Sequence, residues 1–172
     1  QDSLIETVKK HKNIDVFENR FAIEIITQHH LGKTVTRGTP DITCYGAYVL
    51  DIESGSVDTF LSKVTTMATG GIGAVYQTTT NPLVATGDGI AMVYRAKGTV
   101  KDMEFVQFHP TALALPDCPN FLLSEAVRGA GAILRNMKGE RFMPKYHEMA
   151  ELAPRDVVAR CIFKEMQEAG SD

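Results

Sequence analysis

The spacing of apolar residues changes near Met103, and this change limits the folds that the chain can adopt. Before Met103, apolar residues fall mostly in short alternating or β-rich runs, which are typical of strands. After it, helical spacing and short strands are mixed. The sequence therefore predicts an α+β or α/β chain in two parts, residues 1–103 and 104–172.

Individual elements are predicted from apolar spacing and turn residues. In the first part they are a helix at residues 4–8, strands at 14–17 and 21–25 (the second with one buried face), a hairpin of 44–51 with 57–67, and a helix from 90 that Gly98 ends. In the second part they are a strand at 104–108, a helix at 122–129, a strand at 132–136, a turn at 137–140 and a final helix that opens at 153–156.

Charge and composition argue against two classes of protein. The 18 basic and 21 acidic side chains give a net charge of -3 without a dense Lys/Arg cluster, so a nucleic-acid partner is not expected. No apolar run approaches the roughly 20 residues that a membrane span needs. Residues 1–3 begin no signal or transit peptide, and a cytoplasmic protein is expected.

The three cysteines, Cys44, Cys118 and Cys161, are odd in number, widely spaced and outside any Cys-x-x-Cys motif. This pattern favours neither a disulfide framework nor a structural zinc site, and no metal site is predicted. Inert or buried thiols in a reducing compartment are the expectation.

Gly-x-Gly occurs at residues 71–73, 87–89 and 129–131, and none of the three completes the Gly-x-Gly-x-x-Gly of dinucleotide-binding proteins. Tight turns are the simpler interpretation. Two of the glycine segments have a context that favours a cofactor: 68–71 follows a predicted hydrophobic strand, where backbone can approach a cofactor at the carboxyl end of a sheet, and 86–89 opens a predicted helix whose N–H groups can receive an anion. Asp88 could also cap that helix.

Polar residues gather in the second part, at Gln107, His109, Ser124-Glu125 and Arg155. Arginine offers a planar fork for carboxylates, and histidine can titrate near neutral pH, so this set suits a dicarboxylate substrate. Each residue also has a plain structural interpretation. Glu125 and Arg128, three residues apart, could form a solvated ion pair on a helix.

The order of several motifs resembles the succinate dehydrogenase/fumarate reductase flavoprotein family. The segments that carry the resemblance are Ala68-Thr69-Gly70-Gly71, Thr80-Asn81-Pro82, Ala85-Thr86-Gly87-Asp88-Gly89, Glu104 to Thr111, Ser124 to Gly129, Gly139 to Met143 and Ala153 to Arg160. Within that family, the 120–125 run and the gap from His109 to Glu125 look like the branch that acts on L-aspartate. The resemblance implies an FAD enzyme that oxidises L-aspartate to iminoaspartate, with oxygen or fumarate as acceptor, in de novo NAD biosynthesis, where quinolinate synthase is a linked enzyme.

Site residues follow from the same resemblance. His109, Ser124 and Glu125 match the cluster that binds the substrate carboxylates, Gln107 is expected to face the substrate, and Arg155 matches the arginine assigned to proton transfer at the substrate carbon. The residues matching segments that lie along FAD are Gly70, Gly71, Thr86, Gly87 and Asp88. Ser124 replaces a frequent threonine and keeps its hydroxyl, whereas Ala130 stands where the family usually has glutamate.

The resemblance also implies an internal piece of a longer protein. Residues 1–103 are expected to be the C-terminal part of an FAD-binding Rossmann-like domain without its N-terminal Gly-x-Gly-x-x-Gly unit, and 104–172 the start of an α+β capping domain. The isolated chain is therefore expected neither to hold FAD tightly nor to turn over aspartate. The alternatives are a fumarate reductase or succinate dehydrogenase flavoprotein subunit, and a cofactor-free structural domain derived from such an enzyme.

Overall fold

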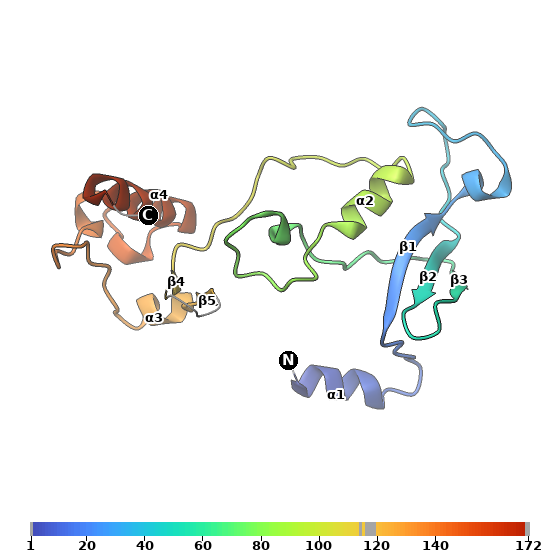
Figure 1. Cartoon of the computed structure of the whole chain (residues 1–172), viewed down its shortest axis with the longest axis horizontal. Helices are drawn as coiled ribbons and strands as arrows, with labels where there is room; N and C mark the ends of the chain where they lie inside the picture. The colour runs from blue at the N-terminus through green and yellow to red at the C-terminus, as the bar shows by residue number, and fades with distance from the viewer. Residues whose placement is uncertain (1, 114, 116–119, 171–172) are drawn as a thin grey trace. The chain divides into compact units, whose positions relative to one another are not determined.

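The computed structural model describes residues 2–113, 115 and 120–170 (Figure 1). The contacts between residues divide the chain into two compact units. The first unit consists of Gln1–Gly71 and Gly87–Val100, and the second of Ile72–Thr86 and Lys101–Asp172. In the described residues both helices and strands occur, which agrees with the mixed α/β content expected from the sequence.

The first unit is built on an antiparallel three-stranded sheet of β1 (Arg20–Ile26), β2 (Gly46–Asp51) and β3 (Val57–Leu61), in the order β1-β2-β3. The predicted hairpin is confirmed by the β2–β3 pairing. Gly46 has φ +140°, and a Cβ there would lie 1.8 Å from the carbonyl oxygen of Phe60, so only glycine fits this close approach. A bulge after Ala22 breaks the alternation of β1, and the expected single buried face is not found: Phe21 is exposed whereas Ile25 and Ile26 are both buried.

Two further strand predictions in the first unit need correction. Residues 14–17 follow helix α1 (Asp2–Lys10) but form no strand, because the N–H of Ile14 already donates to His11 in a turn at 3.1 Å. Strand β3 ends at Leu61 instead of continuing to Met67. The segment 68–71 therefore follows irregular backbone, not a strand.

Helix α2 (Asp88–Arg95) ends in a Schellman motif. The N–H of Lys97 donates to Tyr94 at 3.0 Å, and the N–H of Gly98 donates to Val93 at 2.9 Å. The left-handed residue is Lys97, with φ +66°, and not the glycine that the sequence suggested as the stop. Gly98 is required for another reason, because a Cβ there would lie 2.6 Å from the Val93 side chain.

The second unit is organised around α4 (Arg155–Ala169), which begins just after Pro154 as predicted. Its other elements are β4 (Ala112–Leu113), β5 (Phe121–Leu122), α3 (Glu125–Gly129) and the 3-10 turns η3 (Met143–Lys145) and η4 (Ala150–Leu152). The core contains Phe142, Met143, Ala153, Val158 and Cys161.

Three predictions in the second unit were wrong or too long. Residues 104–108 form no strand, and 132–136 contribute only an isolated bridge from Arg135 to Arg141. The helix expected at 122–129 begins at Glu125, because residues 121–122 pair with β4 and Ser124 caps the helix. The turn at 137–140 is confirmed by the hydrogen bond from Gly139 N–H to the Asn136 carbonyl at 2.9 Å.

Candidate active site

An ion pair joins the first residues of α3 and α4. Arg155 approaches one oxygen of Glu125 with two nitrogens, Nε at 2.7 Å and Nη2 at 2.6 Å. Its third nitrogen, Nη1, donates to the side-chain oxygen of Gln107 at 3.3 Å. Both charged side chains are about 40% exposed, so a ligand can reach the pair.

Local sequence explains why these residues lie where they do. The backbone of Pro154 at the N-cap of α4 places Arg155 in the first turn. Ser124 caps α3, with its Oγ accepting the N–H of Ala126 at 3.3 Å, and so places Glu125 in the first turn of that helix. The Ser124 hydroxyl keeps its own proton available as a donor.

The electrostatics of the cluster favour an ionised Glu125. The hydrogen bond from Arg155 lowers the pKa of this carboxyl group, burial opposes the change, and the charges of Arg155, Arg128 and His109 lower the pKa further. One carboxylate thus lies among two guanidinium groups and an imidazole. The surplus of positive charge suits the binding of an anionic substrate.

Arg128 is a residue whose importance the sequence did not reveal. The solvated pair with Glu125 is not what the structure shows, because the Arg128 side chain is only 3% exposed and its Nη2 lies 3.8 Å from Glu125. Nη1 donates to the backbone oxygen of Glu151 at 2.5 Å, whereas Nε and Nη2 are buried without a hydrogen-bond partner among the described residues. The i,i+3 spacing and the place of Arg128 in the Ser124 to Gly129 motif were the signals for this residue.

His109 and Gln107 line the same cavity of about 150 Å³, together with residues of the 73–81 segment. The Nδ1 atom of His109 lies 3.2 Å from the N–H of Thr111. The same Nδ1 atom lies 3.1 Å from the carbonyl oxygen of Thr111, so the imidazole either accepts from the N–H, with its proton on Nε2, or donates to the carbonyl through Nδ1. All five predicted substrate-site residues therefore belong to the second unit: Gln107, His109, Ser124, Glu125 and Arg155. The role of each stays a prediction.

The predicted cofactor segments 68–71 and 87–89 meet in the first unit. A Cβ on Gly89 would lie 1.7 Å from Oγ1 of Thr69, so glycine at 89 permits the contact between them. Gly70, with φ +73°, and Gly71 are exposed, and nothing lies within 4 Å of the Cβ position of either. A bound group can therefore approach this backbone closely, which fits the FAD expected here.

The remaining cofactor residues lie at the start of α2. Gly87, with φ +81°, is the N-cap of this helix, so Asp88 is its first residue and not its cap. Thr86 is exposed, and its Oγ1 donates to the carbonyl of Val84 at 3.3 Å. These positions fit a segment that lies along a cofactor, and their roles stay predictions.

The thiols and the possible metal sites add nothing to this cluster. Cys161 is buried, and burial raises the pKa of its thiol, whereas Cys44 donates to Thr65 at 3.3 Å; Cys118 lies outside the described residues. Within the described ranges, no cluster of His, Cys, Asp and Glu could hold a metal ion.

In that same part of the chain, no helix is long and apolar enough to cross a membrane.

Comparison with known proteins identifies the class. Residues 2–172 match the family model described as FAD binding domain, and the chain belongs to this family of flavoproteins. The resemblance seen in the order of the motifs is thereby confirmed, and FAD is the cofactor of the family.

The similar proteins narrow the assignment. L-aspartate oxidase 2-b, chloroplastic, of Nicotiana tabacum is 51% identical over 98% of this chain and 26% of its own length. L-aspartate oxidase 1 of Ralstonia nicotianae is 51% identical over 99% of this chain and 31% of its own. An E. coli quinol fumarate reductase structure superimposes with a TM-score of 0.77 at 29% identity, covering 97% of this chain and 28% of that one. The chain spans about a quarter to a third of the length of these proteins.

Proposed function

We propose that the full-length protein containing this chain is an FAD-dependent L-aspartate oxidase, which oxidises L-aspartate to iminoaspartate with oxygen or fumarate as acceptor. The observation that carries the proposal is the Arg155–Glu125 ion pair, held next to Gln107 in a chain whose relatives are L-aspartate oxidases. The reaction would belong to de novo NAD biosynthesis, with its product passing to quinolinate synthase. We also propose a cytoplasmic location.

The substrate carboxylates would be bound by donors that the structure leaves available. The side-chain oxygen of Gln107 accepts from Arg155, so its NH2 group can donate to a ligand. The Ser124 hydroxyl and the imidazole of His109 are further donors. Charge-assisted hydrogen bonds of this kind are worth about 1.5–3 kcal/mol each, which is enough to fix the orientation of a small dicarboxylate.

FAD, when bound, supplies the two-electron chemistry of the oxidation. The oxidation would break the Cα–H bond and one N–H bond of the substrate amine, releasing two electrons and two protons, and Arg155 is the group proposed to take the proton at the substrate carbon while the amino proton leaves to solvent. Because a guanidinium is normally fully protonated, Arg155 must pass its own proton onward as it takes another. Glu125, whose oxygen lies 2.6 Å from Nη2, is positioned to receive that proton.

The proposal is tested in the full-length flavoprotein by Arg155→Gln with Arg160→Gln as a matched control. Arg160 lies on the same helix, pairs with Asp156 at 2.6 Å and is 69% exposed. Loss of a positioned proton-transfer group typically costs about 10²–10⁴ in rate, so kcat for aspartate should fall by that factor in Arg155→Gln and stay near wild type in the control, with the flavin spectrum unchanged in both. Retention of half the wild-type kcat by Arg155→Gln would contradict the proposed role.

The second candidate function is a fumarate reductase or succinate dehydrogenase flavoprotein subunit, and the structural similarity to quinol fumarate reductase favours it. Substrate preference separates the two. We expect the full-length protein to oxidise aspartate faster than succinate, measured by hydrogen peroxide release and by reduction of an artificial dye. A preference for succinate would replace the aspartate assignment.

The isolated chain is proposed to be inactive. It carries the glycine segments 68–71 and 86–89 but no complete Gly-x-Gly-x-x-Gly motif. Purified chain incubated with FAD and passed over a gel-filtration column should emerge without the yellow flavin absorbance. Stoichiometric retention of FAD would show that these segments suffice for binding.

A further inference from the structure

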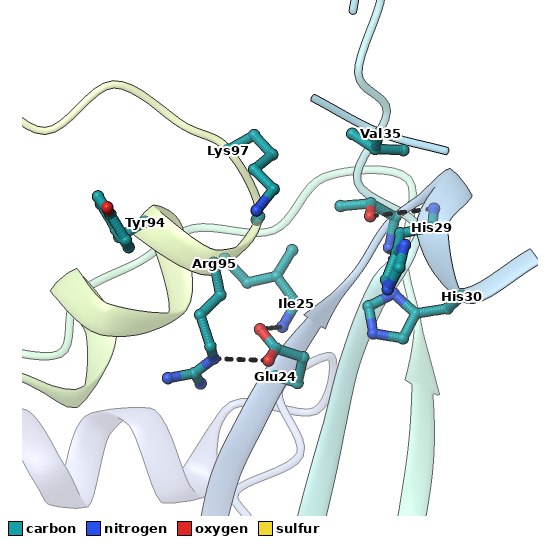
Figure 2. Close-up of a pocket in the computed structure, with 10 residues that line it drawn as sticks. Glu24, Ile25, His29, His30, Val35, Tyr94, Arg95 and Lys97 are labelled. Atoms are coloured by element: carbon teal, nitrogen blue, oxygen red, sulfur yellow. Dashed lines mark hydrogen bonds and ion pairs between the residues drawn. The ribbon is translucent and has the colours of Figure 1, made fainter. Parts of the chain in front are cut away.

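A cavity of about 400 Å³ lies within the first unit, apart from the residues of the proposed active site (Figure 2). Glu24 of β1 and the two histidines of η1 (Gln28–Leu31) line one side, and Arg95, the last residue of α2, and Lys97, just after the helix, line the other. Nothing in the proposed oxidation of aspartate uses this cavity.

The charge in the cavity is predominantly positive. Among the lining residues, all of which are described, Glu24 is the one carboxylate, and its Oε2 is paired with Nε of Arg95 at 2.6 Å. Its other oxygen accepts the N–H of Ile25 at 3.3 Å. Lys97, by contrast, is exposed and makes no ion pair within the described ranges. Its ammonium group is therefore available to a ligand in the cavity.

The histidine side offers a donor in a fixed position. The backbone N–H of Thr27 donates to Nδ1 of His30 at 3.1 Å, so a neutral His30 ring carries its proton on Nε2. Thr27 is 3% exposed, and its Oγ1 accepts the N–H of His29, completing a capping box. The His30 ring also packs edge-on against Tyr48 with centroids 5.5 Å apart. This arrangement restricts the imidazole before any ligand binds.

The backbone of Lys97 occupies the left-handed position of the Schellman motif that ends α2. Its φ of +66° is a left-handed conformation that favours glycine, and a lysine in this conformation lowers the stability of the fold. The last carbonyls of α2 already accept from the N–H groups of residues 96–98, so the Lys97 ammonium group is not needed to complete the helix end.

We propose that this cavity binds a small oxyanion, a compound with a phosphate group or with two carboxylates, through Lys97 and His30. The ammonium group of Lys97 and the imidazole of His30 line the cavity, and its volume of about 400 Å³ exceeds that of a single inorganic phosphate, leaving room for the rest of a small molecule. The proposal does not depend on the oxidation of aspartate, and either can fail without the other.

The test uses the full-length FAD-bound protein and titration calorimetry at constant ionic strength, with inorganic phosphate in one arm and malonate in the other. Lys97→Gln removes the ammonium group, and Lys101→Gln, at an exposed lysine that lines none of the described cavities, is the matched control. Lys97→Arg serves as a second variant that keeps the charge.

We expect binding in at least one arm, weakened about tenfold or more by Lys97→Gln and unchanged by Lys101→Gln, with Lys97→Arg retaining most of the affinity. The arm that responds identifies the class of oxyanion, phosphate or dicarboxylate. Absence of binding in both arms overturns the proposal, and so does binding that Lys97→Gln leaves unchanged, because the proposed active site can itself take a dicarboxylate such as malonate. So does equal weakening by the two glutamine variants, which would indicate nonspecific charge attraction.

Discussion

Glu151 connects three parts of the second unit, and its replacement by glutamine gives a quantitative prediction. Its carboxylate accepts Nε and Nη2 of Arg141 at 3.0 and 2.6 Å and the N–H of Leu134 at 3.2 Å, while its side chain is 4% exposed. The hydrogen bond from Arg141 lowers the pKa of Glu151 from 4.5 to about 2. The amide in Glu151→Gln would place an NH2 group against the guanidinium and leave one donor of Arg141 unpaired.

The magnitude follows from this pKa. At about 1.36 kcal/mol per pH unit, the fall from 4.5 to about 2 sets an upper limit of about 3 kcal/mol. The Arg141 side chain is 45% exposed, so water screens the pair, and about 1–2 kcal/mol is the expected loss at neutral pH. Because the folded pKa lies below the unfolded one, the stabilisation is complete above about pH 4.5 and is lost as the pH falls through about 2.

The assay is hydrogen exchange by mass spectrometry on the full-length protein, following peptides from residues 141–169. Glu151→Gln should speed exchange there about 5–30-fold at pH 7, and the difference from wild type should narrow between pH 5 and pH 3 after correction for intrinsic rates. Glu148→Gln, at an exposed glutamate, should have no effect. Wild-type exchange rates in Glu151→Gln at pH 7, or a difference at pH 3 as large as the difference at pH 7, would refute the reasoning.

Three further predictions can be checked by thermal unfolding or by the same exchange measurement. Val158→Ala, at a fully buried position, should cost about 2 kcal/mol, whereas Phe163→Ala, at a side chain 59% exposed on the same helix, should cost less than half of that. Ala150→Gly should stabilise the 146–152 region by up to about 1 kcal/mol, because Ala150 holds φ +46°; a loss of stability would contradict this. Gly46→Ala should cost about 3 kcal/mol or more and loosen β2 and β3, whereas Gly55→Ala, where a Cβ meets nothing within 4 Å, should cost about 1 kcal/mol.

Local signals in the sequence predicted elements well where the backbone needs no distant partner. The first helix, the β2–β3 hairpin, the turn at 137–140 and the start of α4 were all found, because spacing and turn residues decide them within a few positions. The order of the motifs also identified the flavoprotein family. The strands expected at 14–17, 104–108 and 132–136 failed, because an apolar run becomes a strand only where another strand lies alongside to accept its hydrogen bonds.

The site shows the same division between sequence and tertiary structure. The sequence determined which residue types are present: a glutamine, a glutamate and an arginine in motifs that suit a dicarboxylate. Only the fold brought Arg155 within hydrogen-bonding distance of Glu125, 30 residues earlier, and of Gln107, 48 residues earlier. Likewise, only packing buried Arg128, since the cost of removing a charge from water depends on what surrounds it and not on its neighbours in the chain.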